Sequence, residues 1–184
     1  GRFQLEVPAG DSLEIRVTLL GYKPLVRQLF LEEGTTTSLE LELQPDTSMI
    51  LPAYDDSSWP DAMMPNFVED ISSNYRDYDG YSWFRKTFIL DKNKLNGDIE
   101  CHLGKIDDAD ATWFNGQLIG KTDSYNALRV YPVDKELIVD GKNTVVVRVL
   151  DGSGKGGFWG NPEDMYLADA NGKIRSLAGN WKFN

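Results

Sequence analysis

The clearest structural signal in the sequence is Ile106-Asp-Asp-Ala-Asp-Ala-Thr-Trp-Phe-Asn-Gly-Gln-Leu-Ile-Gly120. Within it, Asn115 and Gly116 separate two short apolar pairs, Trp113-Phe114 and Leu118-Ile119. A two-residue type I′ turn needs positive φ at both central positions, and Asn and Gly tolerate that conformation best. The stretch therefore predicts a β-hairpin that turns at Asn115-Gly116.

Three aspartates, Asp107, Asp108 and Asp110, interrupt the strand that leads into this hairpin. Their carboxylates are compatible with a hydrogen-bonding patch for a glycan, with a cation site, or with a structural corner that accepts backbone N–H groups. Calcium takes about six to eight oxygen ligands, and no recognisable loop supplies the remainder. The structural corner is therefore favoured, the glycan patch stays open, and no metal site is assigned.

Period-two alternation of apolar and polar residues continues on both sides of the hairpin. Strands are expected at residues 82–90, 99–106, 128–133 and 144–150, with a last hairpin at Asn171-Gly172. His102 alternates with Cys101 and Leu103, so we expect it to face solvent. Residues 54–80 have no period and predict a long loop, and residues 152–160 form a glycine-rich loop.

These patterns together predict the fold class. About eight strands fall in the later part of the chain, and no segment shows a sustained helical period. The prediction is an all-β fold, a jelly-roll galactose-binding-like sandwich of two packed antiparallel sheets.

The first part of the chain predicts a small antiparallel β unit. Residues 3–43 alternate with period two, with apolar positions at 3–7, 13–19 and 39–43, and predict about four strands in a meander. The alternation ends at Gln44-Pro45, so we place a boundary near residue 47, with units at residues 1–46 and 47–184.

One string in this first unit imitates a catalytic motif. Gly10-Asp11-Ser12-Leu13 spells the Gly-Asp-Ser-Leu motif of a lipase and esterase family, in which the serine is the nucleophile. Such a serine needs a general base within hydrogen-bond reach and an oxyanion hole, and His102 is the one histidine. Without an α/β hydrolase pattern around it, the string predicts a hairpin turn, and no catalytic residue is assigned.

Composition excludes several classes of function. The 184 residues carry a formal net charge of −10, which opposes binding to nucleic acid and to anionic membrane surfaces. No stretch approaches the roughly 20 apolar residues of a membrane-spanning helix. One cysteine and one histidine provide neither a disulfide nor a zinc cluster, and no cofactor is expected. The start at Gly1-Arg2-Phe3, without Met, predicts a piece of a longer parent protein.

Several separated strings resemble known families. The later unit resembles the galactose-binding-like sugar-binding domain of family 2 glycoside hydrolases, on Asp55–Trp59, Trp83–Phe88, the Asn-Gly hairpin and Gly141–Val149. It is also similar to the sandwich domain of sialate O-acetylesterases, on Gly104–Asp110, Arg129–Val133, Gly157–Leu167 and Ser176–Lys182. Residues 1–46 resemble part of a carboxypeptidase-regulatory-like, or prealbumin-like, β unit, on Gly1–Gly10 and Gly21-Tyr22-Lys23.

The resemblance implies a non-catalytic module, for carbohydrate binding or scaffolding, in an enzyme whose catalytic domain is a neighbour in the parent chain. The alternatives are a purely structural spacer and the sugar-binding domain of a family 2-type glycoside hydrolase. It further implies a secreted, periplasmic or cell-envelope location, and a glycan as the expected ligand.

A sugar site pairs an aromatic platform with polar groups that fix the orientation of the sugar. The candidate carbohydrate-binding residues are Trp59, Asp108, Tyr125, Arg129, Trp159 and Glu163. Two alternatives stay open: the loop tryptophans Trp59 and Trp159 bind a glycan or pack the loops, and Arg129, like Arg85, reaches a sugar acid or neutralises acids inside the sandwich. Asp56, Glu163 and Asp164 could in principle form an acid and base pair, but no partner geometry supports it.

Overall fold

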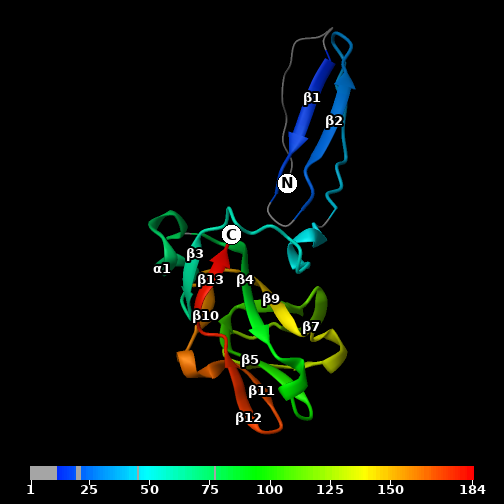
Figure 1. Ribbon diagram of the computed structural model, residues 1–184. Coiled ribbons are helices and arrows are strands. Elements are labelled where there is room, and N and C mark those ends of the chain that lie inside the picture. The colour runs from blue at the N-terminus through cyan, green and yellow to red at the C-terminus, as the bar shows by residue number, and fades with distance from the viewer. Residues whose placement is uncertain (1–11, 20–21, 45, 77) are drawn as a thin grey trace. The chain divides into compact units, whose positions relative to one another are not determined.

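The computed structural model describes residues 12–19, 22–44, 46–76 and 78–184 (Figure 1). The chain divides into two compact units, residues 1–47 and residues 48–184. The described part of the first unit contains one two-stranded sheet, and that of the second unit contains two larger sheets.

In the first unit, β1 (Ser12–Val17) pairs antiparallel with β2 (Leu25–Phe30). The strand predicted around Leu39–Leu43 is wrong, because residues 31–44 contain no strand. A strand needs a ladder of backbone bonds, and among the described residues one backbone bond joins this segment to the rest of the unit, from Lys23 N–H to Gln44 O at 2.8 Å. The strand predicted near residue 3 and the turn at Gly10-Asp11 lie outside the described residues, and the prealbumin-like identity of the unit stays a prediction.

The second unit is built almost entirely of strands joined by short 3-10 turns. Its strands are β3 (Asp61–Met64), β4 (Gly80–Leu90), β5 (Ile99–Asp107), β6 (Ala109–Phe114), β7 (Gln117–Thr122), β8 (Leu128–Val133), β9 (Gly141–Asp151), β10 (Gly157–Trp159), β11 (Met165–Asp169), β12 (Gly172–Ser176) and β13 (Gly179–Phe183). Its helical turns are η1 (Thr47–Ile50), α1 (Val68–Ile71), η2 (Ser73–Tyr75), η3 (Lys92–Lys94), η4 (Lys135–Leu137) and η5 (Pro162–Asp164).

These strands form two sheets. The six-stranded sheet has the order β3-β13-β4-β9-β6-β7. In the five-stranded sheet, β5 pairs with β8, β10 and β11, and β12 extends the sheet beyond β11. Every pairing is antiparallel.

The core lies between the two sheets. From the six-stranded sheet, Phe84, Phe114 and Val147 are fully buried, and Leu103 and Leu167 meet them from the five-stranded sheet. Alternating positions of each strand point inward, because successive side chains of a strand face opposite sides. The predicted all-β sandwich is confirmed.

The predicted hairpin is also confirmed. Asn115 and Gly116 have φ values of 47° and 90°, as a type I′ turn requires. The Asn115 side chain has a further role, because its Nδ2 donates to Leu137 O and its Oδ1 accepts from Thr144 N, both at 2.8 Å. The turn is therefore tied to the start of β9 by side-chain bonds that the turn propensity does not predict.

Four short elements occupy segments where the sequence predicts loops. β3, α1 and η2 lie within residues 54–80, and β10 lies within the glycine-rich loop. Runs of three or four residues are too short to show a period, and β3 is held by a partner distant in the sequence, since Ala62 pairs with Trp181 of β13.

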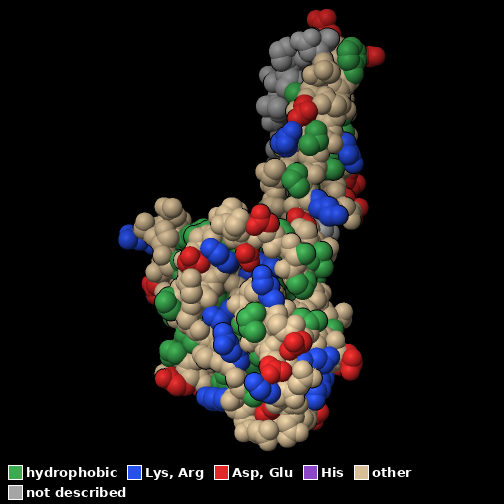
Figure 2. Space-filling view, viewed as in Figure 1, with side chains coloured by type: hydrophobic (Ala, Val, Ile, Leu, Met, Phe, Trp, Pro, Cys, Tyr) green, Lys and Arg blue, Asp and Glu red, His purple; other side chains and the backbone are tan. Residues whose placement is uncertain are grey.

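Lysine and arginine side chains are interspersed with acidic ones on the face of the second unit shown in Figure 2. Among the helices of the described residues, none has the length and apolar character needed to cross a membrane.

Candidate functional site

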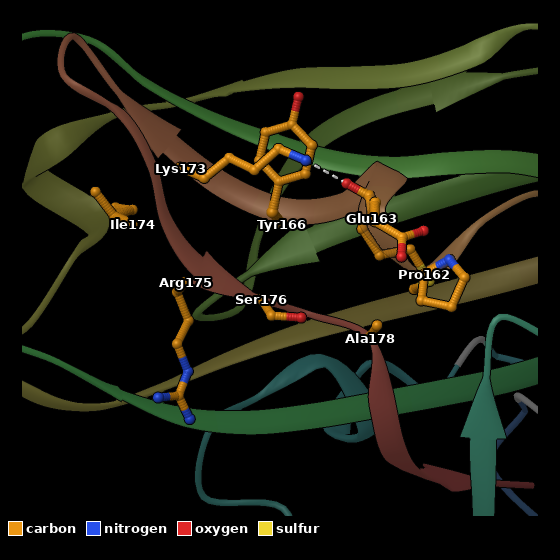
Figure 3. Close-up of a pocket in the computed structure, with 9 residues that line it drawn as sticks. Pro162, Glu163, Tyr166, Lys173, Ile174, Arg175, Ser176 and Ala178 are labelled. Carbon is orange, nitrogen blue, oxygen red and sulfur yellow. Dashed lines mark hydrogen bonds between the residues drawn. The ribbon is translucent and has the colours of Figure 1, made fainter.

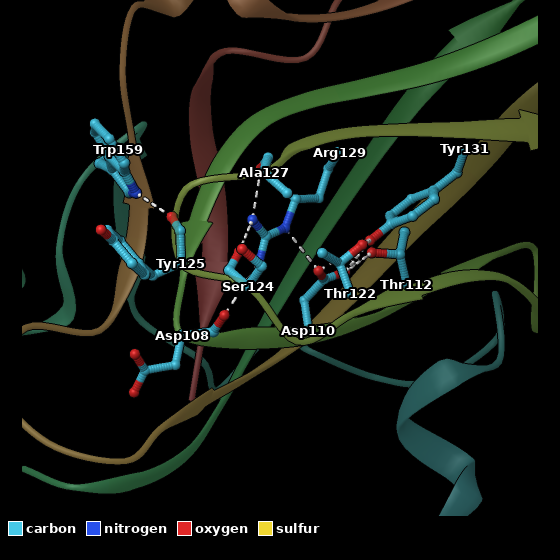
Figure 4. Close-up of polar contacts among 10 residues, drawn as sticks. All are labelled: Asp108, Asp110, Thr112, Thr122, Ser124, Tyr125, Ala127, Arg129, Tyr131 and Trp159. Carbon is cyan, nitrogen blue, oxygen red and sulfur yellow. Dashed lines mark hydrogen bonds and ion pairs between the residues drawn. The ribbon is translucent and has the colours of Figure 1, made fainter.

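The aspartates before the hairpin have separate roles, and Asp110 is part of a buried ion pair (Figure 4). Its Oδ1 accepts a hydrogen bond of 2.9 Å from Arg129 Nε, and both side chains are fully buried. Arg129 also donates to the backbone carbonyls of Ser124 and Ala127, at 2.6 Å each, and to Asp108 O at 3.3 Å. The guanidinium is therefore surrounded by acceptors of its own chain.

Hydroxyl groups complete the environment of the Asp110 carboxylate. Tyr131 Oη donates to it at 2.9 Å, and Thr112 Oγ1 donates at 2.8 Å. Burial raises the pKa of Asp110, and the hydrogen bonds from Arg129 and Thr112 oppose that rise. The Tyr131 ring fits because residue 120 is glycine: a Cβ there would lie 2.1 Å from the ring.

Arg85 forms a second buried pair on β4. Its Nε donates to Asp56 Oδ2 at 2.9 Å, and its other nitrogens donate to Met49 O and Leu51 O. Asp56 is thereby committed to a salt bridge. Asp164 closes the η5 turn by accepting from Asn161 N at 3.3 Å. Arg85 and Arg129 therefore each neutralise an aspartate of the sandwich, Asp56 and Asp110 respectively.

Tyr125, which is exposed, and Trp159, which is half-buried, lie side by side in the predicted site. Trp159 Nε1 donates to Tyr125 O at 2.9 Å, the Lys105 ammonium lies 4.3 Å from the Trp159 ring centroid, and 59% of Tyr125 is exposed. Asp108 belongs to the same neighbourhood, as Figure 4 shows, and its Oδ2 accepts from Gly152 N at 2.8 Å. Asp108 thus has the structural-corner role, and its second oxygen leaves the glycan role as a prediction.

The other two predicted residues lie elsewhere. Trp59 is 6% exposed and packs edge-on against Tyr54, with ring centroids 5.5 Å apart. That burial favours loop packing over a sugar platform for Trp59. Glu163 lines a groove to which neither Tyr125 nor Trp159 contributes (Figure 3). The structure therefore brings together Asp108, Tyr125, Trp159 and the buried Arg129, whereas Glu163 lines a different groove and Trp59 is buried.

Sequence reasoning missed a pair of carboxyl groups, Glu69 of α1 and Asp151 at the end of β9. Glu69 Oε2 and Asp151 Oδ2 are buried without a hydrogen-bond donor. Burial first, and then the hydrogen bond and charge of Glu69, raise the pKa of Asp151 to about 6. Burial and Asp108 raise the pKa of Asp107 to about 6 as well. No sequence pattern predicts the Glu69–Asp151 pair, because the two residues lie far apart in the sequence.

This pair makes stability depend on pH. The folded pKa of Asp151 lies above its ordinary value of 3.8, so its contribution is complete below pH 3.8 and is lost as pH rises through about 6. Glu69→Gln removes one charge and provides a donor for Asp151. We expect the variant to be more stable than the native chain by about 1 kcal/mol at pH 7.5, with a smaller difference at pH 4.5.

Urea unfolding followed by tryptophan fluorescence measures this difference, since all five tryptophans lie in residues 48–184. Glu136→Gln, an exposed charge change, serves as the control and should show no such pH dependence. An equal stability difference for Glu69→Gln at both pH values would show that Glu69 does not raise the pKa of Asp151.

Metal binding has little support in this region. Across the residues that the structure describes, no group of three His, Cys, Asp or Glu side chains could hold a metal ion. The calcium alternative for Asp107, Asp108 and Asp110 therefore lacks a ligand set there.

Comparison with known proteins shows which family and which relatives the chain resembles. The family described as the beta-galactosidase second all-beta domain matches residues 45–154. Probable beta-galactosidase A of Emericella nidulans is 29% identical over 121 residues, which cover 60% of this chain and 12% of that relative. The chain thus spans about an eighth of the length of the curated relative that it matches.

Solved structures give the same fold. A beta-glucuronidase of Bacteroides uniformis matches with a TM-score of 0.54 and 18% identity, over 74% of this chain and 16% of its own. Bacteroides uniformis beta-glucuronidase 2, covalently bound to cyclophellitol-6-carboxylate aziridine, matches with a TM-score of 0.54 and 19% identity, over 73% and 15% of the two chains. These findings support a family 2-like glycoside hydrolase β domain and do not support the sialate O-acetylesterase part of the resemblance.

Proposed function

The chain belongs to the family of the beta-galactosidase second all-beta domain, and from this membership we propose that it is a non-catalytic sandwich domain that supports a neighbouring catalytic domain in a glycoside hydrolase. The observation that carries the proposal is the family match over residues 45–154, which extends from before β3 through β9. The small share of the Emericella relative that the chain spans supports an accessory role.

The polar interior supports a structural function. Arg85 and Arg129 are buried, and their donors bind acceptors of this chain. Among the described residues, Arg129 donates four hydrogen bonds and Arg85 donates three, all to acceptors of this chain, so these networks hold loops on the sheets. A rigid sandwich of this kind is suited to hold a second domain in one orientation.

Hydrolysis assays test the proposal. The 184-residue chain is expected to release no nitrophenol from nitrophenyl β-galactoside or β-glucuronide, whereas its full-length parent is expected to hydrolyse at least one of them. Turnover by the chain alone, lost in Ser12→Ala, would overturn the non-catalytic role. A full-length parent with no activity on any glycoside would overturn the proposal that the parent is a glycoside hydrolase.

Glycan contact by the exposed Tyr125 and the half-buried Trp159 is the second candidate function. It is favoured by the 59% exposure of Tyr125 beside a tryptophan whose indole is already fixed by a hydrogen bond. Calorimetric titration of the 184-residue chain with galactose-containing glycans tests this candidate. Binding heat that disappears in Tyr125→Ala and persists in Leu128→Ala would support this candidate, and its absence would leave the structural role.

Two narrower expectations belong to the proposal. A sialate O-acetylesterase is the alternative parent, and release of acetate from acetylated sialosides by the full-length protein would favour it over a glycosidase. A secreted, periplasmic or cell-envelope location for the parent is the accompanying expectation.

A further inference from the structure

The outer face of the six-stranded sheet carries an arginine that lies against three aromatic rings. Alternate residues of β4 and β9 face away from the core, and Arg148 of β9 is one of them. Its guanidinium carbon lies 4.6 Å from the ring centroid of Tyr81, 5.7 Å from that of Trp83 and 5.9 Å from that of Trp113. The two indoles stack, with centroids 5.6 Å apart and 22° between their planes. Cation–π contacts therefore hold Arg148 in place.

This cluster leaves hydrogen-bond donors unpaired. Among the described residues, the Arg148 side chain forms neither a hydrogen bond nor an ion pair, and Trp83 Nε1 is buried without an acceptor. A ring face attracts a guanidinium but accepts none of its in-plane N–H groups. A carboxylate pairs with such a guanidinium through two parallel N–H bonds. The cluster is therefore complementary to an anionic group.

Exposed leucines border the cluster on the same face. Leu150 lies opposite Tyr81 in the strand register and is 36% exposed, and Leu118 lies opposite Trp113 and is 38% exposed. None of these residues lines the groove beside Glu163 or a second groove, between β5 and β11. Small-molecule sites are concave, whereas protein interfaces use Trp, Tyr and Arg as anchors. A protein surface therefore suits this face better than a small ligand does.

The Arg148 face is defined here as Tyr81, Trp113, Leu118, Arg148 and Leu150, and its size favours a tethered partner. A stable complex between separate chains uses about 20–30 residues on each side, which is far more than this face provides. Domains of one chain associate through smaller and more polar interfaces, because their linker keeps the local concentration high. An adjoining domain of the same parent thus fits better than a second copy of this chain.

We propose that the Arg148 face is the surface on which the catalytic domain of the parent docks, with a carboxylate of that domain paired to Arg148. Tyr81 and Trp113 lose their remaining exposure in this contact, and Leu118 and Leu150 form its apolar border. The proposal deepens the proposed function and rests on it in taking a catalytic domain as the neighbour.

Hydroxyl-radical footprinting, read by mass spectrometry, tests this surface in the 184-residue chain and in the full-length parent. We expect oxidation of Tyr81 and Trp113 to be severalfold lower in the parent. Tyr166 is the matched reference, because it is half-buried like Tyr81 but faces outward from the other sheet, where it stacks on His102. Its oxidation should be the same in both proteins.

The variant Arg148→Gln, made in both proteins, should abolish the difference in oxidation between them, because the docking carboxylate loses its partner. Comparing the same variant in both proteins cancels any exposure that the substitution itself creates. Arg175→Gln is the matched control, because Arg175 is an exposed arginine of β12 in the other sheet. It should leave the protection of Tyr81 and Trp113 unchanged, and circular dichroism verifies the fold of each variant.

Equal oxidation of Tyr81 and Trp113 in the chain and in the parent would overturn the proposal, as would protection that survives Arg148→Gln. Protection that grows with the concentration of the isolated chain would identify a second copy as the occupant and would overturn it as well. Footprinting needs no turnover, so its failure is seen separately from a failure of the hydrolysis assays.

Discussion

Replacement of Asp110 by alanine is expected to lower the free energy of unfolding of residues 48–184 by about 3–5 kcal/mol. The change leaves the Arg129 guanidinium buried without its carboxylate, although both side chains are fully buried in the native chain. It also removes the acceptor of Tyr131 Oη and Thr112 Oγ1. Urea unfolding followed by tryptophan fluorescence measures the loss.

Two comparisons separate the ion pair from a general effect of charge. Asp123→Ala removes an exposed aspartate just beyond β7 and should change stability by less than about 0.5 kcal/mol. Combining Asp110→Ala with Arg129→Met removes both charges, so it should be less destabilising than the sum of the single changes. An Asp110→Ala loss no larger than that of Asp123→Ala would show that the pair is not structural.

Trp181→Ala is expected to cost about 3–5 kcal/mol, because it opens a large cavity in the core. Trp181 is 1% exposed in β13, packs on Phe158 with ring centroids 5.6 Å apart, and donates from Nε1 to Leu177 O at 2.7 Å. Its strand joins β3 to β4. The same denaturation experiment measures the effect, and a thermal midpoint provides a second readout.

Trp181→Phe retains most of the apolar volume and loses the indole bond, so its cost should be clearly smaller than that of the alanine variant. Leu128→Ala, at a position that is 63% exposed, should have little effect. If Trp181→Ala were tolerated as well as Leu128→Ala, β13 would not be part of the cooperative core.

Local signals were sufficient for the hairpin and the long strands. The turn at Asn115-Gly116 depends on the φ values that these two residues adopt, and β9 follows from valines that alternate with period two. The strand predicted at Leu39–Leu43 had the same alternation and failed, because alternation provides a face but not a pairing partner. Conversely, β3 has little pattern and forms because β13 pairs with it.

Local sequence pattern predicted the candidate site less well than it predicted the strands. Arg129 and Trp59 carry the residue types of a sugar site, but the structure buries both; Tyr125 and Glu163 are exposed, and Asp108 and Trp159 are half-buried. The Glu69–Asp151 pair could not be predicted, because α1 and the end of β9 meet only after the chain folds.

Backbone preference, side-chain period and charge are enough to predict the all-β class, the Asn115-Gly116 turn and the acidic character of the segment before it. What the acids do follows from the fold. Asp110 is buried against Arg129, Asp108 accepts from Gly152, and Asp107 keeps a raised pKa beside Asp108. Desolvation and pairing depend on neighbours, and the partners of Asp110 and Asp108, which are Arg129 and Gly152, are distant in the chain and come together only when the sheets form.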